Sequence, residues 1–315
     1  MINAIKAGMD VISSHLAVLI LPLALDAMLW FGPRLSVQKI LTSFFDQVVA
    51  LNIQNNIQVT ELLANRDGFI EKLSRFNLFS ILRTFPIGVS SLVSGNLTIE
   101  NPLGAQSVLE VGSLFSLFGW FILLTFIGWI LGGLYFNWVS GIIGNRDSKQ
   151  GSGRALLQTL WFSLVFTAVA LMIGIPLMFL LGLLGLVSSA ILEIVIFILA
   201  LASAWVIVPI FFSPLGIYVR GQNVFRSIYT SFRMARFTLP TSSMFVLAVF
   251  VISQGLNYLW AVPEDNSWMG LVGIAGHAFI TTALLAACFI YYRDLNNWLE
   301  IVFERMKAGT AAPQA

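Results

Sequence analysis

The sequence predicts an all-α membrane protein, a polytopic bundle of transmembrane helices, and composition and patterning lead to this class. Of the 315 residues, 58% are hydrophobic and 10% are charged. Soluble domains carry about 25% charged residues, so this chain has too few polar side chains to cover its apolar ones in water. The mean hydropathy is +0.88, and the apolar residues gather in runs of membrane-spanning length. Polar segments between these runs divide the chain into six expected spans.

Charge, cysteine and histidine content argue against several functions. A net charge of +2 and an isoelectric point of 8.8 are too mild to suggest nucleic acid, so we expect no such partner. Cys288 is the single cysteine, which rules out an internal disulfide and a cysteine-built metal site. Neither His15 nor His277 stands in a catalytic or metal-binding motif. We therefore expect no metal, no cofactor and no enzymatic activity; an intramembrane enzyme built around His277 is the third-ranked alternative.

The first segment, residues 1–31, is expected to contain one transmembrane helix at residues 11–30. The preceding Lys6 also fits a signal peptide, but residues 24–27 offer no cleavage site between small residues, and the apolar run is long enough to span. A retained anchor is therefore favoured. Pro22 is expected to kink this helix, because proline lacks a backbone N–H and its ring crowds the preceding turn.

Residues 32–109 differ in kind and are expected to form an extracytoplasmic helical cap. Apolar side chains recur at helical spacing over residues 37–48 and again over 57–63 and 69–79, but no run is apolar enough to span. Positive and negative charges balance in this segment. We expect small amphipathic helices pressed onto the membrane or onto the bundle, with a type I turn at residues 101–104.

The following bundle, residues 110–300, is expected to hold five spans. The first of these lies at residues 111–138, where Gly128 and Gly132 form a GxxxG pattern typical of close helix packing. The next apolar stretch, residues 156–212, is long enough for two crossings or three. Two crossings place the arginine-rich segment that follows on the same side as the positive loop before it. Three would place it outside, against the positive-inside bias, so we choose two.

The remaining boundaries follow from breaks in the apolar runs. The two crossings are expected to meet near residues 186–189, with a bend in the first at residues 174–176. The last spans are expected at residues 242–262 and 268–292, joined by an acidic loop, and residues 301–315 form a cytoplasmic tail. Six spans leave both termini in the cytoplasm and put the lysines and arginines outside the long first loop on that side. We expect the protein in the plasma membrane, the inner membrane of a bacterium.

Residues 221–237 predict an amphipathic helix lying in the cytoplasmic membrane interface. Its apolar face carries Val224, Phe225, Ile228, Tyr229 and Phe232, and its polar face carries Asn223, Ser227, Thr230 and Ser231. Four arginines belong to the same segment: Arg220, Arg226, Arg233 and Arg236. These arginines would either bind anionic lipid headgroups at phosphate level or serve only to orient the protein.

Polar groups inside the expected spans are candidates for a site, because such groups are expensive in a bilayer. The candidates are Asp26, Glu193, Gln254, Asn257 and His277. At 1.5 Å per residue all five fall in the outer half of the membrane, so they could converge on a cavity that holds a proton, a cation or a lipid headgroup. The alternative is separate local arrangements, with Asp26 paired to Arg34 and Glu193 reaching the surface. Helix order decides between the two, and the sequence does not reveal it.

The segment around the arginines and the last span carry a resemblance. Residues 225–233 read FRSIYTSFR, and the last span closes on residues 290–294, IYYRD. Over residues 140–300 this arrangement resembles a group of uncharacterised bacterial membrane proteins related to the membrane domain fused to some glycerophosphodiester phosphodiesterases. The resemblance implies a six-helix bundle of unknown activity and transfers no catalytic residue. Residues 32–109 lie outside the usual pattern, and no phosphodiesterase domain is present.

These observations predict a non-enzymatic integral membrane protein with a lipid-associated or accessory role. Its expected partners are membrane lipids, anionic headgroups above all, and a partner membrane protein. The alternative is a transport permease subunit that docks a cytoplasmic ATPase subunit through residues 221–237. Residues 238–240, TLP, are similar to the end of an importer coupling loop, but the Glu-Ala-Ala and glycine that define that loop are missing.

Overall fold

The computed structural model describes residues 1–54, 75–95, 100–144, 151–264 and 266–310, together with Gly68 and Ile70. Helices dominate these residues, so the all-α class is confirmed. The predicted helix at residues 57–63, about half of the one at 69–79, and residues 145–150 of the positive loop lie outside the described residues.

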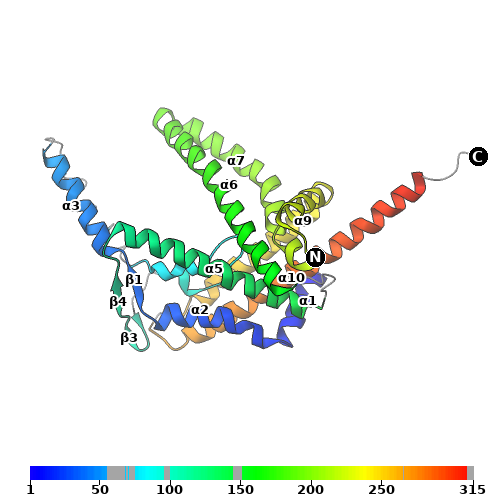
Figure 1. The fold of residues 1–315 in the computed structure, drawn as a ribbon, viewed down its shortest axis with the longest axis horizontal. Coiled ribbons are helices and arrows are strands. Elements are labelled where there is room, and N and C mark those ends of the chain that lie inside the picture. Colours follow the sequence, from blue (N-terminus) through cyan, green and yellow to red (C-terminus); the bar gives the residue numbers. More distant parts are fainter. Residues whose placement is uncertain are drawn as a thin grey trace, which may run out of the picture.

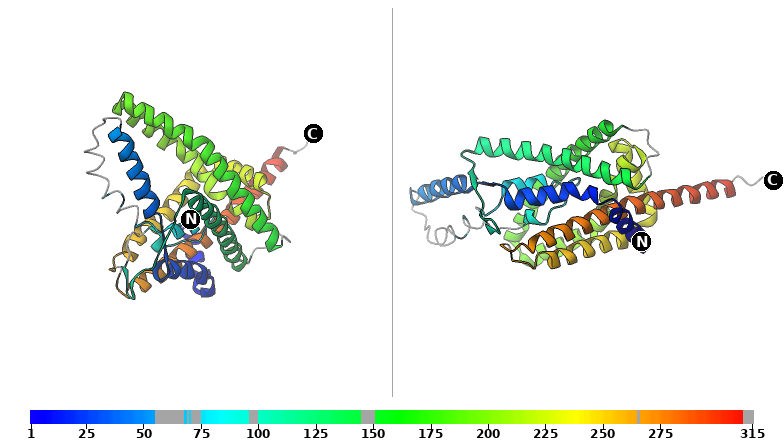
Figure 2. Two further views of the ribbon diagram at one scale, coloured as in Figure 1. Left: turned by 60° about the vertical axis from the view of Figure 1, so that its left-hand side comes forward. Right: turned by 90° about the horizontal axis from the view of Figure 1, so that it is seen from below.

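Four helices form the centre of the protein: α2 (Ile20–Phe31), α5 (Leu114–Ile142), α9 (Val224–Trp260) and α10 (Gly270–Thr310). They run side by side (Figure 2), with α2 and α9 ending where α5 and α10 begin. The Trp30 ring lies against Gly270 at this end of the bundle, which we call the Trp30 end.

The opposite end is named the Arg220 end. There α5 stops, α6 (Ser152–Val187) starts, and α9 begins after α7 (Ser189–Phe212) and the short α8 (Leu215–Arg220). The backbone N–H of Val224 donates to Gln158 Oε1 at 3.1 Å, which ties the start of α9 to the start of α6.

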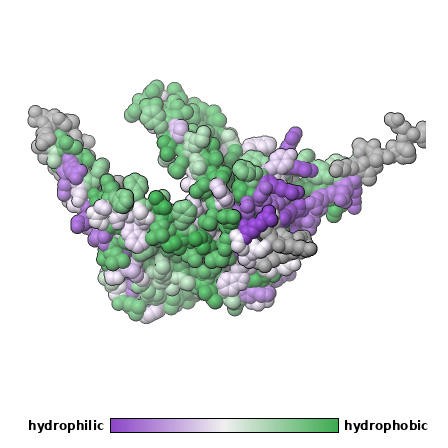
Figure 3. All heavy atoms as spheres, in the orientation of Figure 1, coloured by the Kyte–Doolittle hydropathy of each residue, from purple (hydrophilic) through white to green (hydrophobic). Residues whose placement is uncertain are grey.

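Four helices are individually long and apolar enough to cross a bilayer: α5, α6, α9 and the Gly270–Met306 part of α10. Two bent pairs each add a crossing if the pair is taken as one span, namely Ile2–Ser13 with Leu16–Phe31, and Ser189–Ser203 with Trp205–Arg220. Among the described residues the structure therefore contains four to six candidate spans. Figure 3 shows a hydrophobic surface over the middle of the molecule, with hydrophilic residues gathered on both sides of it, as membrane insertion requires.

The first apolar run is not one continuous helix. α1 (Ile2–Ser13) is followed by η1 (Leu16–Leu19) and α2, and the two halves meet at 92°. The break falls at Ser14 and His15, whose side chains lie 2.9 Å from the carbonyl oxygen of Val11 at the end of α1. The expected kink at Pro22 is therefore wrong: this proline sits in the first turn of α2, where its missing N–H costs no hydrogen bond.

α1 lies against α10 through a face of small and aliphatic residues. Ala4, Gly8 and Ile12 are buried one turn apart. A Cβ on Gly8 would lie 2.4 Å from the carbonyl oxygen of Ala283, so only glycine permits this approach of the two helices.

Two pairs of short strands lie between α2 and α5, in a segment predicted to form small helices joined by turns, without strands. β1 (Arg34–Ser36) pairs in parallel with β4 (Val108–Glu110), and β2 (Glu100–Asn101) pairs antiparallel with β3 (Gly104–Ala105). The turn predicted at residues 101–104 joins the second pair, where Gly104 takes a φ of +107° that favours glycine. The helix predicted over residues 37–48 is confirmed as α3 (Gln38–Gln54).

Residues 82–95, the re-entrant segment, enter the bundle between α5 and α10 instead of lying on it. They connect the 3₁₀ helix η2 (Leu78–Leu82) with η3 (Val93–Gly95). Ser90 Oγ hydrogen-bonds Thr281 Oγ1 at 2.7 Å. Thr281 follows the start of α10 by eleven positions, about 16 Å along the axis and about half the thickness of a bilayer core.

The GxxxG pair of α5 packs against this re-entrant segment, not against a second helix as expected. A Cβ on Gly128 would lie 2.7 Å from the Leu82 carbonyl oxygen, and one on Gly132 would lie 2.6 Å from the Gly88 Cα. The two glycines therefore make room for non-helical backbone at membrane depth, which is tolerated where protein surrounds it.

The remaining helices follow the predicted boundaries with two differences. α6 and α7 meet at Ser188, as predicted, and form a hairpin that projects away from the bundle (Figure 1). The expected interfacial helix and fifth span are one helix, α9, kinked at Thr238 (φ −129°, ψ 17°) two residues before Pro240. α10 does not end near residue 292 but continues to Thr310.

Candidate functional site

Asp26 anchors the re-entrant segment to α2. Its fully buried carboxylate accepts a hydrogen bond of 2.5 Å from Ser91 Oγ and bonds of 3.1 Å from the backbone N–H groups of Leu92 and Val93. Three donors satisfy a carboxylate that would otherwise be costly to bury. Asp26 therefore holds the start of η3 in place.

Arg34, the alternative partner of Asp26, lies elsewhere. It belongs to β1, and its Nη1 donates to the carbonyl oxygen of Arg75 at 3.5 Å. Burial lowers the pKa of Arg34, and the nearby carboxylate of Glu110 opposes this shift. The expected Asp26–Arg34 pair is absent, because the strand carries Arg34 away from the end of α2.

A second polar connection joins α9 to α10. His277 is only 2% exposed, and its Nδ1 lies 2.7 Å from Asn257 Oδ1. The amide nitrogen of Asn257 donates in turn to Gln254 Oε1 at 3.4 Å. The carboxamide oxygen of Asn257 is an acceptor, so His277 Nδ1 carries the proton and Nε2 is left as the acceptor. His277 Nε2 has no hydrogen-bond partner within the described part of the chain.

A cavity of about 340 Å³ lies at the Trp30 end beside Asn257 and Ser91. The re-entrant segment contributes Arg83 and Ser91, and α9 contributes Gln254 and Asn257. Aromatic side chains and Glu264 complete the walls; the aromatic residues are Trp30, Tyr258 and Trp260. Arg83 is exposed, and its Nη1 donates to Ser94 Oγ at 3.2 Å. This hydrogen bond fixes the guanidinium group at the cavity.

The structure brings four of the five candidate polar residues to this region and leaves one outside. Gln254 and Asn257 line the cavity, His277 bonds to Asn257 from behind the wall, and Asp26 bonds to the lining residue Ser91. Glu193 does not join them: it is exposed near the start of α7, on the projecting hairpin.

Sequence reasoning missed Arg83 and Ser91, which it placed in an outer cap. The serine- and glycine-containing stretch at residues 90–95 indicates non-helical chain, but nothing in it signals insertion into the bundle.

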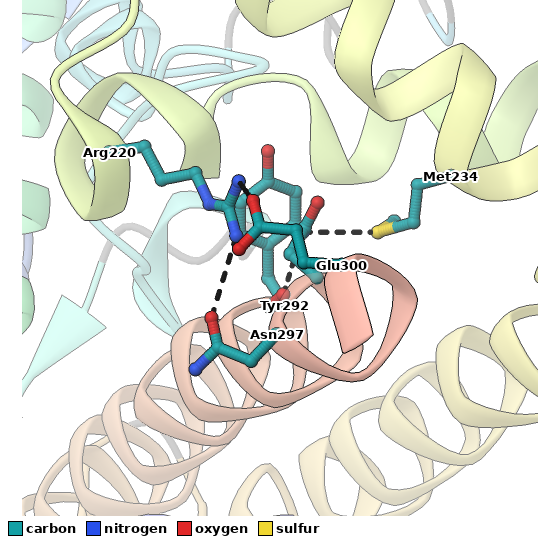
Figure 4. A network of polar contacts seen from close by, with 6 residues as sticks. Arg220, Met234, Tyr292, Asn297 and Glu300 are labelled. Atoms are coloured by element: carbon teal, nitrogen blue, oxygen red, sulfur yellow. Dashed lines mark hydrogen bonds and ion pairs between the residues drawn. The ribbon is translucent and has the colours of Figure 1, made fainter. Parts of the chain in front are cut away.

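At the Arg220 end the structure separates the four candidate arginines. Arg220 Nη1 lies 2.6 Å from Glu300 Oε1, and its Nη2 donates to Asn297 Oδ1 at 3.5 Å (Figure 4). The guanidinium carbon of Arg233 lies 4.6 Å from the centre of the Phe303 ring. Arg226 and Arg236 are exposed and form no ion pair among the described residues. Among these four arginines, Arg220 alone pairs with a carboxylate in the part of the chain that the structure describes.

The first half of α9 buries the face that was expected to meet water. Ser227 and Ser231 are fully buried, and Ser227 Oγ donates to the carbonyl oxygen of Ser213 at 2.5 Å. The aromatic side chains point outward, with Phe225 74% and Tyr229 68% exposed. The expectation of a solvated polar face is wrong at Ser227 and Ser231, because small serines permit close packing on neighbouring helices; the outward rings agree with the apolar face expected to meet lipid.

The chain matches no protein-family model, no curated protein and no solved structure. The resemblance to the membrane domain of glycerophosphodiester phosphodiesterases therefore remains a hypothesis, as does the permease alternative. Within the described residues, no three histidine, cysteine, aspartate or glutamate side chains gather where they would hold a metal ion.

Proposed function

We propose that the chain is a non-enzymatic, lipid-associated integral membrane protein that binds a lipid headgroup in the cavity at its Trp30 end. The observation that carries this proposal is the placement of Arg83 beside the carboxamides of Gln254 and Asn257. A guanidinium and amide N–H groups are donors to phosphate oxygens, and the charged donor makes the strongest of these bonds.

The surroundings of the cavity suit an amphiphile. Trp30, Tyr258 and Trp260 line it where the apolar helices end, and tryptophan and tyrosine favour the headgroup level of a bilayer. The carboxylate of Glu264 in the wall suits the amine of a zwitterionic headgroup, while Arg83 suits its phosphate. A lipid would thus reach the cavity without leaving its own depth in the membrane.

We further propose six spans, with each bent pair taken as one, in a bacterial inner membrane with both termini in the cytoplasm. Arginines gather at the Arg220 end, which the positive-inside rule assigns to the cytoplasm; they are Arg154, Arg220, Arg226, Arg233 and Arg236. The Trp30 end and residues 32–109 then face outward as an extracytoplasmic cap, and the cavity opens toward the outer leaflet.

The test measures lipid retention by the purified full-length protein. Protein extracted from membranes rich in phosphatidylethanolamine and phosphatidylglycerol is examined by native mass spectrometry, with the variants Arg83→Gln and Gln254→Leu beside the unaltered chain. Both side chains are exposed, so these changes leave the packing intact. Loss of a charge-assisted hydrogen bond costs about 1.5–3 kcal/mol, which is about tenfold or more in affinity.

Arg226→Gln, which removes the same charge at the other end, is the matched control and should retain lipid normally. Equal retention by Arg83→Gln, Gln254→Leu and the unaltered protein would refute headgroup binding in this cavity.

A further inference from the structure

A second hollow lies at the Arg220 end, between α7 and the first half of α9, and we call it the α7–α9 groove. Its volume is about 660 Å³, twice that of the cavity at the Trp30 end. Its walls are mainly apolar, with four aromatic side chains and two arginines; the residues that matter are Trp205, Tyr229, Phe232, Arg233, Arg236 and Phe237. The groove is independent of the cavity proposed above as the headgroup site, since no residue lines both.

The charge of the groove is positive and is not compensated within it. No aspartate or glutamate stands among its lining residues. Arg233 is positioned over the Phe303 ring at 4.6 Å and also lines a neighbouring hollow that contains Glu300, but it forms no ion pair with any residue that the structure describes. Arg236 forms no ion pair in the described part of the chain. An anion bound here would meet two guanidinium groups that have no competing carboxylate in the groove.

The other two arginines of this segment provide a contrast. Arg220 is paired with Glu300 at 2.6 Å (Figure 4) and lies outside the groove. Arg226 is exposed on the same helix as Arg233 and Arg236, two turns before the former, but does not line the groove. In the sequence the four arginines form one positive segment. In the structure two of them, Arg233 and Arg236, line the groove and the other two do not.

Polarity changes along the groove over the length of a lipid headgroup. From Arg233 to Leu239 helix α9 advances by six residues, about 9 Å, and after the two arginines the lining consists of Phe237 and Leu239; Tyr229 and Phe232 line the groove on the other side of the arginines. Trp205, 64% exposed, faces the same space from α7. The kink at Thr238 lies next to Phe237 and Leu239, and the part of α9 that follows it is more apolar.

We propose that the α7–α9 groove binds one anionic phospholipid, with its phosphate between Arg233 and Arg236 and an acyl chain along Trp205 and Phe237. The combination of two uncompensated cations with an aromatic wall matches an amphiphilic anion. An inorganic phosphate would use only the cationic side, and a zwitterionic lipid would gain less from two guanidinium groups.

The experiment measures binding of phosphatidylglycerol and phosphatidylcholine to the purified full-length protein in detergent, by native mass spectrometry with lipid titration. The unaltered protein should prefer phosphatidylglycerol. Each arginine near an anionic surface contributes about a fivefold factor, so Arg236→Gln should reduce the preference about fivefold and Arg233→Gln with Arg236→Gln about 25-fold. Arg236→Gln is informative alone, because Arg233 also stacks on Phe303 and its loss could disturb folding.

The control Arg226→Gln removes the same charge from the same helix and should change the preference by less than twofold. An equal effect of Arg226→Gln and Arg236→Gln would overturn the proposal, because general positive charge would then explain the binding. Displacement of the lipid by millimolar inorganic phosphate would overturn it too, since a soluble anion would then suffice. Trp205→Ala should weaken the binding of phosphatidylglycerol of full chain length more than the binding of a short-chain analogue. Equal weakening of both would refute the proposed acyl-chain contact.

Discussion

Replacement of Asp26 by asparagine tests whether this residue holds the re-entrant segment inside the bundle. The carboxylate accepts three hydrogen bonds, from Ser91 Oγ and from the N–H groups of Leu92 and Val93. The asparagine side chain has nearly the same shape but only one oxygen, and its NH₂ group would face donors. At least one backbone N–H would therefore lose its acceptor in a buried place.

The magnitude follows from these bonds. Each buried donor left without a partner costs about 1–3 kcal/mol. With one or two donors stranded, Asp26→Asn should lower the free energy of unfolding by about 1–6 kcal/mol, which covers the range seen when a buried hydrogen-bond network is broken. Asp10→Asn is the matched control, because Asp10 is exposed on α1 and the change there should be within about 0.5 kcal/mol.

Two measurements on purified protein in detergent check this expectation. Thermal unfolding reports the loss of stability, and thiol labelling of Ser94→Cys reports exposure of the re-entrant segment, with Cys288, the native cysteine, replaced by alanine. Labelling should be faster in the Asp26→Asn background than in the Asp10→Asn background. An unchanged melting temperature together with unchanged labelling would show that Asp26 does not anchor this segment.

Three further predictions concern the topology, the glycine contacts and the ion pair. Cysteines placed at Ser152 and Ser267 should react with an impermeant reagent from opposite sides of the membrane, with position 267 external; reaction of both from one side would refute six spans. Gly132→Ala should cost about 1–3 kcal/mol in thermal unfolding because its Cβ would lie 2.6 Å from the Gly88 Cα, while Gly119→Ala, with no neighbour within 4 Å, should not destabilise. A double-mutant cycle with Arg220→Gln and Glu300→Gln should give a coupling of at most about 1 kcal/mol, since the Glu300 side chain is 61% exposed; a coupling above this value would contradict a solvent-screened pair.

The α6–α7 boundary shows what sequence reasoning recovers well. Ser188 separates two long apolar runs, and its side chain also accepts a hydrogen bond from the N–H of Ile191 at the start of α7. Both signals are local, so they are visible without knowledge of the fold. The same holds for the turn at Gly104 and for the aromatic and positive residues at the two ends of the helices.

The re-entrant segment shows where this reasoning stops. Residues 82–95 are too short to span a membrane and are interrupted by proline, glycine and serine, yet they lie between α5 and α10 because Gly128 and Gly132 leave space and Asp26 supplies acceptors. Each of these three partners lies more than 30 positions from the segment along the sequence. No local pattern could reveal that the glycine pair packs against a loop, because the same GxxxG sequence also occurs where two helices pack together.

The face of α9 was misjudged for a related reason. Helical spacing separated Ser227 and Ser231 correctly from Phe225 and Tyr229, but it did not show which side is covered by protein. In water the rings would be buried, whereas at a membrane the environment outside is also apolar and small serines can turn inward. Periodicity thus identifies two faces, and the solvent and the neighbours decide which one packs.

By itself the sequence determined that this protein belongs in a membrane, where most of its apolar helices begin and end, and which polar residues lie deep along them. These properties depend on composition and on the spacing of residues along the chain, and both can be read directly from the sequence. Only the tertiary structure decided that Asp26, Gln254, Asn257 and His277 gather around one region while Glu193 stays apart, and that the re-entrant segment brings Arg83 to them. Lateral neighbours depend on packing between distant segments, and in a bilayer hydrophobicity does not select among helices that are all apolar.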